Sequence, residues 1–179
     1  MQTLLLGCGN SRERKIIYDD LSTSFDDLTT IDMNPDCNPD ILMDLNTLST
    51  IRKALPFEDG CFDEIAAYDF LEHIGEQGDW RGFFNEFAEY HRVLKPGGIM
   101  GILVPVGPDA LADPGHKRFF SNSHFCFLSQ KFYAEALGKG DAVTDYRWYW
   151  KKDFRVKFLE NNGHHIGCLL EKLDDGNKP

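Results

Sequence analysis

The feature that most constrains the fold is a short apolar run that ends in a turn containing two glycines. Leu4 to Leu6 are all leucine, and Gly7-Cys8-Gly9 follows them directly. This is the pattern of a buried strand entering a tight turn. A second apolar stretch, Leu28 to Ile31, ends at Asp32, which follows Gly9 by 23 residues. Ligands of doubly wound sheets bind beyond the carboxyl ends of the strands, so we expect a site here.

The turn and the acid together indicate a nucleoside ligand. A carboxylate at this distance accepts the hydroxyl hydrogens of a ribose, and glycines let the backbone approach a ligand closely. An ordinary tight turn gives the same Gly-x-Gly pattern, so the turn alone does not decide. The fingerprint for nicotinamide dinucleotides needs a third glycine, where this chain has Arg12. A bulky side chain there disfavours a pyrophosphate, so we expect a ligand without one.

Strand and helix patterns alternate along the rest of the chain. The expected strands are Leu4–Leu6, Leu28–Ile31, Ile41–Met43, Phe62–Tyr68, Ile99–Val104, Phe154–Leu159 and His165–Leu173. Helices are expected after a capping box of Asn10 and Glu13, in two stretches between Tyr68 and a stop at residues 95–98, and over Ser129–Leu137 with Gly138 as its stop. We therefore predict one domain over residues 1–179. Its fold is α/β and Rossmann-like, a doubly wound, mostly parallel seven-stranded sheet with a C-terminal antiparallel hairpin strand.

The motifs in the middle of the chain are more specific. Phe62-Asp63-Glu64-Ile65 leads to Leu71-Glu72-His73-Ile74, and later comes His91-Arg92-Val93-Leu94-Lys95-Pro96-Gly97-Gly98. Together they resemble the class I S-adenosylmethionine-dependent methyltransferases, and more narrowly their branch acting on small molecules. The resemblance runs from Leu4 to about Leu173. The chain departs from the family pattern at Leu5, where an acid is usual, and at Ser11, where glycine is usual.

The resemblance implies S-adenosylmethionine as cofactor and S-adenosylhomocysteine as product. It places these residues around the cofactor: Gly7, Cys8, Gly9, Asp32, Met33, Asp44, Leu45, Tyr68 and Asp69. Asp32 would hold the ribose, and Met33 would lie against one face of the adenine. Asp44 and Leu45 would bind the adenine edge, although a turn or cap role for Asp44 gives the same pattern. Tyr68 and Asp69 would face the transferable methyl group.

Three side chains are candidates for catalysis, namely Asp69, His73 and His116. Asp69 and His73 are four residues apart, so on a helix they would share a face and form an acid–base pair. A structural role for His73 is the alternative that we favour. Residues 113–116 resemble the segment that covers the acceptor pocket in many relatives. That position makes His116 a base or a donor that orients the acceptor.

The residues after His116 are expected to meet the acceptor. Arg118 would bind a carboxylate or phosphate group, and Phe119 and Phe120 would wall the pocket. Ordinary core packing is the alternative for these phenylalanines. We predict no metal site, because the adjacent histidines His164 and His165 lack carboxylate or cysteine partners nearby in the sequence.

Composition limits the kinds of partner and cellular environment that we expect for this chain. The formal net charge is -10, so a nucleic-acid partner is disfavoured. The five cysteines are scattered without a C-x-x-C pair, which favours a reducing cytoplasm. The longest apolar run, Ile99 to Val104, is too short to span a membrane.

The aromatic and basic stretch over residues 146–152 suits either single-stranded nucleic acid or an edge strand or subunit contact. We favour the contact, which allows a homodimer. We expect a methyltransferase acting on an unidentified small-molecule acceptor. A non-catalytic S-adenosylmethionine-binding module is the main alternative. A nucleotide-dependent oxidoreductase is a weaker one.

Overall fold

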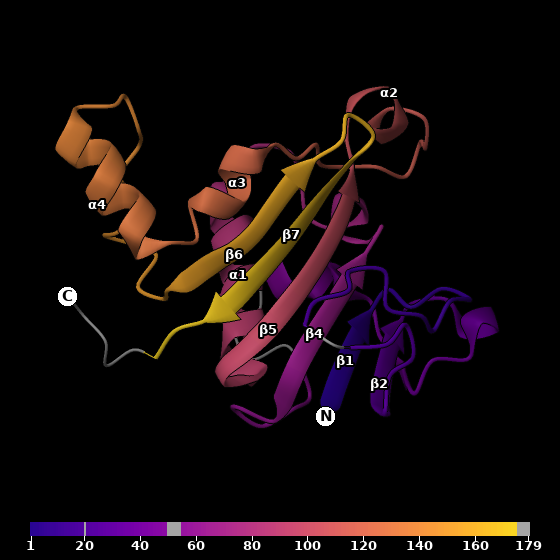
Figure 1. The fold of residues 1–179 in the computed structure, drawn as a ribbon. Helices are drawn as coiled ribbons and strands as arrows, with labels where there is room; N and C mark the ends of the chain where they lie inside the picture. The colour runs from indigo at the N-terminus through magenta and orange to yellow at the C-terminus, as the bar shows by residue number, and fades with distance from the viewer. Residues whose placement is uncertain (20, 50–54, 175–179) are drawn as a thin grey trace.

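A computed structural model describes residues 1–19, 21–49 and 55–174. These residues form a seven-stranded sheet with the order β3-β2-β1-β4-β5-β7-β6 (Figure 1). The strands are β1 Gln2–Leu6, β2 Asp27–Asp32, β3 Ile41–Leu42, β4 Phe62–Tyr68, β5 Leu94–Pro105, β6 Phe154–Asn161 and β7 His165–Lys172. The helices are α1 Trp80–Val93, α2 Gly107–Ala110, α3 Asn122–Cys126 and α4 Gln130–Lys139, with 3-10 turns η1 Pro35–Cys37, η2 Leu45–Ser49 and η3 Leu71–His73.

The predicted sheet topology is confirmed. β1 pairs in parallel with both β2 and β4, and β4 pairs in parallel with β5. β7 runs antiparallel to its neighbours β5 and β6, as predicted for the C-terminal hairpin strand. Strand order reverses between β1 and β4, so the carboxyl ends of these strands form the switch point at which α/β sheets bind ligands.

The two faces of the sheet are packed differently. The large core lies on the face covered by α1, which buries Phe83, Phe87 and Tyr90 at helical spacing. Phe125 of α3 and Tyr133 of α4 belong to the same core. Figure 1 shows α1 behind the sheet, with α3 and α4 beyond β6. The smaller cluster on the opposite face contains Leu5, Cys8, Ala66 and Tyr68.

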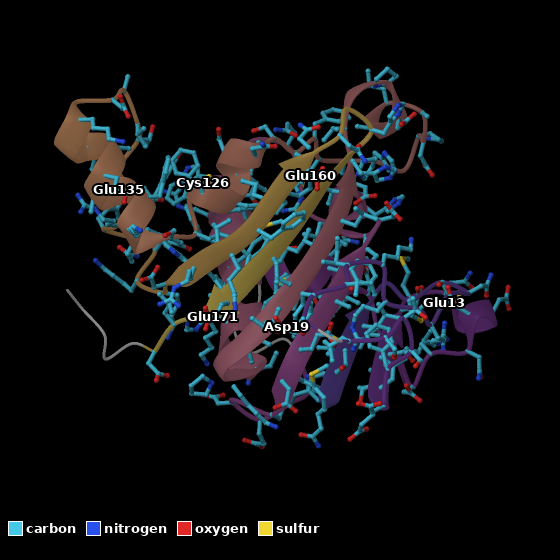
Figure 2. The ribbon with its side chains drawn as sticks, in the orientation of Figure 1. Glu13, Asp19, Cys126, Glu135, Glu160 and Glu171 are labelled. Atoms are coloured by element: carbon cyan, nitrogen blue, oxygen red, sulfur yellow. The ribbon has the colours of Figure 1, made fainter. Side chains whose placement is uncertain are left out.

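The helix predicted after Gly9 does not form, so the capping-box prediction was wrong. Among the described residues between β1 and β2 the chain is irregular, and it crosses the second face of the sheet. Ile16 lies against that face, where a Cβ on Gly101 of β5 or Gly167 of β7 would come within 3.7 or 3.3 Å of it. Figure 2 shows Glu13 on the side of the sheet that holds β2 and Asp19 further towards β5. Long-range contacts of this segment outweigh its local helical signal.

Two element boundaries also differ from prediction. β5 begins at Leu94 and includes the Lys-Pro-Gly-Gly run, which was expected to lie outside the strand. Leu94 already pairs with Phe62, and the register then shifts before Ile99 pairs with Glu64. α4 continues to Lys139 and is capped by Gly140, which has a positive φ of 81°, rather than stopping at Gly138. Glycine adopts this left-handed cap conformation most readily, and Gly140 supplies it two residues later than predicted.

The aromatic stretch at residues 146–152 is not an edge strand. Trp150 is buried, donates from Nε1 to the Leu128 carbonyl at 3.0 Å, and stacks on Phe84 with ring centroids 5.4 Å apart. Trp148 is 63% exposed. The stretch therefore packs on α1 as part of the core. Within this stretch, Trp148 is the residue that exposes a large apolar side chain to solvent. No helix in the described part of the chain has the length and apolar character needed to cross a bilayer.

Candidate active site

A cavity of about 300 Å³ lies at the predicted switch point, beyond the carboxyl ends of β1, β2 and β4. The lining contains these residues predicted to belong to the site: Gly7, Gly9, Asp32, Met33, Asp44, Leu45, Asp69 and His73. It also contains these residues that were not predicted site residues: Met43, Asn46, Phe70 and Ile74. The cavity therefore gathers side chains from segments that are far apart in the sequence.

The glycine turn is shaped by close packing and by left-handed backbone. Gly7 has φ +58°, and a Cβ there would lie 2.1 Å from Cδ2 of Phe70. Gly9 has φ +48°, and a Cβ there would meet nothing within 4 Å. Gly9 therefore presents bare backbone to the cavity. Cys8 is buried in the opposite face of the sheet and does not line the cavity.

The carboxylate of Asp32 is oriented by two backbone donors. Gly9 N donates to Oδ2 at 2.9 Å, and Asn34 N donates to Oδ1 at 2.8 Å. Each oxygen keeps a further acceptor site, so the group can still receive two hydroxyl hydrogens. The neighbouring Met33 is 64% exposed and supplies an apolar surface beside this carboxylate.

Asp44 both caps a turn and lines the cavity, so the two sequence interpretations are compatible. Its Oδ1 accepts from the backbone N of Asn46 at 2.9 Å and from Nδ2 of the same residue at 2.7 Å. These hydrogen bonds lower the pKa of Asp44, which keeps the carboxylate charged. Leu45 is buried next to it, and Oδ1 of Asn46 accepts from Gly75 N at 3.3 Å and Lys117 Nζ at 3.0 Å.

Asp69 stands at the end of β4 in a strained conformation, with φ +51°. Its Oδ2 lies 2.6 Å from Lys15 Nζ, and its Oδ1 lies 3.3 Å from His165 Nε2. The predicted pairing of Asp69 with His73 is not formed, because a 3-10 turn replaces the helix that would have aligned them. Tyr68 packs on the opposite face of the sheet with Leu5, and burial raises the pKa of Tyr68 to about 12.

His116 meets η3 from the loop between α2 and α3. Its Nδ1 lies 2.8 Å from the carbonyl oxygen of Ala110, and its Nε2 lies 3.9 Å from Oε1 of Glu72. The rings of His73 and His116 are 4.7 Å apart. Glu72 is buried, which raises the pKa of its carboxyl to about 7.

A second cavity, of about 260 Å³, is lined by all three residues expected to bind the acceptor, Arg118, Phe119 and Phe120. Its other walls include Trp80 and Phe84 of α1. The guanidinium of Arg118 is already engaged, because Nη1 lies 2.8 Å from Glu86 Oε2 and Nη2 donates to the Leu71 carbonyl at 2.8 Å. Arg118 thus holds the wall of this cavity through a buried ion pair.

A known sequence family matches the part of the chain that forms the switch-point cavity. The family described as a methyltransferase domain matches residues 4–102, which is more than half of the chain. The chain belongs to the class I methyltransferases. The matched region contains every residue that lines the switch-point cavity of this methyltransferase. No curated protein sequence matches the chain significantly.

Solved structures share the fold of this methyltransferase at low sequence identity. A methyltransferase from Archaeoglobus fulgidus has 17% identity and a TM-score of 0.55, covering 96% of this chain and 86% of that one. A complex between the Haloferax volcanii Trm112 methyltransferase activator and a putative methyltransferase has 11% identity and a TM-score of 0.54, covering 97% of this chain and 83% of that one. A third structure is the Burkholderia thailandensis 1,6-didemethyltoxoflavin-N1-methyltransferase with bound 1,6-didemethyltoxoflavin and S-adenosylhomocysteine. It has 14% identity and a TM-score of 0.52, covering 96% of this chain and 71% of that one.

The sequence did not predict the side chains that hold the polar residues of this candidate site. Lys15 and His165 hold Asp69, although no local pattern links them to it. Glu72 was noted only as part of a family motif, and its contact with His116 comes from a distant loop.

Proposed function

We propose that this methyltransferase binds S-adenosylmethionine in the switch-point cavity and transfers its methyl group to a small-molecule acceptor. One observation carries the proposal: the cavity combines bare glycine backbone, the doubly oriented carboxylate of Asp32 and the apolar Met33 at the ends of adjacent strands. These features suit a nucleoside with free ribose hydroxyls. When bound, the cofactor supplies a methyl group on a positively charged sulfur.

The residues of the cavity fit each part of this cofactor. Asp32 would accept the ribose hydroxyls, and Met33 would cover the adenine. Asp44, kept charged by its bonds to Asn46, would accept the adenine amino group. At the opposite end, the Lys15–Asp69 pair offers one charge of each sign, which complements the carboxylate and ammonium groups of the methionine portion.

The second cavity is the proposed acceptor pocket. One short segment lines both cavities, since Ile74 lines the switch-point cavity and Glu76 lines the second. Its walls of Trp80, Phe84 and Phe119 suit an acceptor with a planar, apolar portion. Positioning the acceptor and excluding water supply much of the acceleration in methyl transfer.

Asp69, His73 and His116 stay the proposed catalytic residues. Asp69 and His73 line the cofactor cavity, and the ring of His116 contacts that of His73. These groups are placed to orient the acceptor and to handle its proton where the acceptor must lose one.

Calorimetric titration of the purified protein tests the cofactor assignment. S-adenosylmethionine, S-adenosylhomocysteine and NADH are titrated into wild type, Asp32→Ala and the control Asp26→Ala, whose carboxylate is 79% exposed. We expect both adenosyl ligands to bind wild type and Asp26→Ala, and to bind Asp32→Ala at least tenfold more weakly. Binding of NADH alone would overturn the proposal in favour of an oxidoreductase. Turnover of a candidate acceptor then separates an enzyme from a binding module.

A further inference from the structure

The carboxylate of Glu72 has no hydrogen-bond partner for either oxygen among the residues that the structure describes. The residue is only 1% exposed, so water cannot easily supply the missing contacts. Burying a carboxylate without a partner is strongly unfavourable, and buried carboxylates are normally paired with cations or bound to metals. Glu72 therefore requires an explanation that the methyl-transfer residues described above do not provide.

Nearby cations of this chain are already engaged elsewhere. Lys15 is paired with Asp69, Lys117 reaches Asn46, and Arg118 is paired with Glu86. His116 faces Glu72, but its Nε2 is 3.9 Å from Oε1, too far for a hydrogen bond.

Two imidazoles and this carboxylate converge on one point. One ligand atom each of Glu72, His73 and His116 lies within 4.8 Å of the other two. An ion about 2.1 Å from each ligand atom separates those atoms by roughly 3 to 4 Å. Side-chain rotations on binding would have to bring the observed spacing into that range.

The orientation of His116 is fixed by a bond from its other nitrogen. A carbonyl oxygen can only accept, so Nδ1 must donate to the Ala110 carbonyl at 2.8 Å. In the neutral imidazole this leaves the lone pair on Nε2, the nitrogen that lies 3.9 Å from Oε1 of Glu72. Metal-binding histidines likewise donate from one ring nitrogen and bind the metal through the other. The loop is held in place because Lys117 N and Arg118 N donate to the Glu72 carbonyl at 2.7 and 3.2 Å.

We propose that Glu72, His73 and His116 bind one divalent transition-metal ion at the edge of the cofactor cavity. Two imidazoles and one carboxylate suit zinc, manganese or iron in the divalent state, and they leave coordination positions open. Because His73 also lines the cofactor cavity, an ion held by this group would lie at the edge of the proposed reaction site. Resting on the proposed function, the ion would hold a hydroxyl-bearing acceptor and ease the loss of its proton to solvent water.

The test measures metal uptake by the chain itself, without cofactor or acceptor. Protein dialysed against a chelator and then buffer is titrated calorimetrically with ZnCl2 and with MnCl2, and its visible spectrum is recorded with Co²⁺. We expect one ion per chain, with affinity reduced at least 100-fold in Glu72→Gln and His116→Gln. His164→Ala is the matched control, because this surface histidine is 74% exposed in its side chain, and we expect it to bind as wild type does.

A folding control keeps the test decisive. Each variant is melted with and without the ion, and we expect the ion to raise the Tm of wild type and His164→Ala only. His73→Asn serves as a replacement ligand variant if Glu72→Gln does not fold. Absence of stoichiometric uptake, or uptake unchanged in the ligand variants, would overturn the metal site. Loss of S-adenosylmethionine binding with metal uptake intact would overturn the proposed function alone.

Discussion

Arg14 and Glu64 form a buried ion pair that joins the irregular segment after β1 to the middle of β4. Nε of Arg14 donates to Oε1 at 3.0 Å and Nη2 donates to Oε2 at 2.7 Å, with side-chain exposures of 2% and 0%. Nη1 also donates to the carbonyls of Ser22 and Ser24. Arg14 thus holds the irregular segment after β1 against the face of the sheet opposite α1, where the sequence predicts a helix.

Removing this arginine should destabilise the protein strongly. In Arg14→Met the buried carboxylate of Glu64 keeps, among its bonds from described residues, only the one from Thr3 Oγ1 at 3.1 Å. We expect the free energy of unfolding, measured by urea denaturation, to fall by about 3–5 kcal/mol. The double variant Arg14→Met/Glu64→Met should recover part of this loss, because no unpaired charge then stays buried.

An exposed ion pair supplies the comparison for Arg14. Arg155 and Glu171 lie 3.1 Å apart with 60% and 19% exposure. Arg155→Met should cost less than about 1 kcal/mol, since solvent screens the pair. If Arg14→Met cost no more than Arg155→Met, Arg14 would not organise the segment.

Sequence patterns predicted the sheet well because strand burial is encoded locally. The apolar runs of β1 and β4 and the hairpin signal at residues 161–163 specify strands whatever their neighbours are. The helix after Gly9 was wrongly predicted for the opposite reason. Its capping signal is local, but the contacts of Arg14 with Glu64 are 50 residues apart in the chain and outweigh it.

The same distinction holds in the site. Asp32, Met33 and Asp44 could be predicted because they follow strands at family-typical positions, and they line the cavity. Lys15 and the contact of Glu72 with His116 could not, because they depend on how distant loops meet. The course of a loop is set by tertiary contacts that no periodicity records.

The glycine turn gives a prediction that separates strain from ligand binding. Gly9 and Gly140 both have positive φ, +48° and +81°, and a Cβ at either would meet nothing within 4 Å. Replacement of either by alanine should cost about 1–2 kcal/mol of stability from backbone strain. Only Gly9→Ala should weaken S-adenosylhomocysteine binding, by at least tenfold in calorimetry, because Gly9 lines the cavity. Equal binding by both variants would contradict the proposed location of the cofactor.

Acid should weaken the connection between β2 and β3. Thr30 donates to Oδ2 of Asp40 from Oγ1 at 2.7 Å and from N at 2.8 Å, and these bonds lower the pKa of Asp40. Because the folded pKa lies below the unfolded value, the stabilisation is complete above about pH 4 and is lost as the pH falls through the folded pKa. The stability difference between wild type and Thr30→Val, from urea midpoints, should therefore shrink below pH 4.

Thr29→Val is the control for this pH effect, since the carboxylate of Asp40 accepts from the neighbouring Thr30. Its difference from wild type should not change between pH 6 and pH 3. A Thr30→Val difference that stayed constant over the same range would show that Asp40 does not titrate against this bond.

Lys15 should distinguish the amino-acid end of the cofactor from its nucleoside end. Its Nζ lies 2.6 Å from Asp69 Oδ2 at the edge of the cavity, where we place the methionine carboxylate. In Lys15→Ala we expect S-adenosylhomocysteine to bind about tenfold more weakly, the loss of one charge-assisted hydrogen bond. Methylthioadenosine lacks the carboxylate and the ammonium group, so its affinity should change less than about twofold.

Lys157→Ala, on the exposed part of β6, should leave the binding of both ligands unchanged. Equal losses for S-adenosylhomocysteine and methylthioadenosine in Lys15→Ala would mean that Lys15 acts by shaping the loop around the nucleoside. Asp32→Ala should weaken both ligands, because both carry the ribose. The two variants together therefore fix the direction in which the cofactor lies. If Lys15→Ala weakens S-adenosylhomocysteine more than methylthioadenosine, and Asp32→Ala weakens both equally, the methyl group lies beside Asp69 and the cluster of Glu72, His73 and His116.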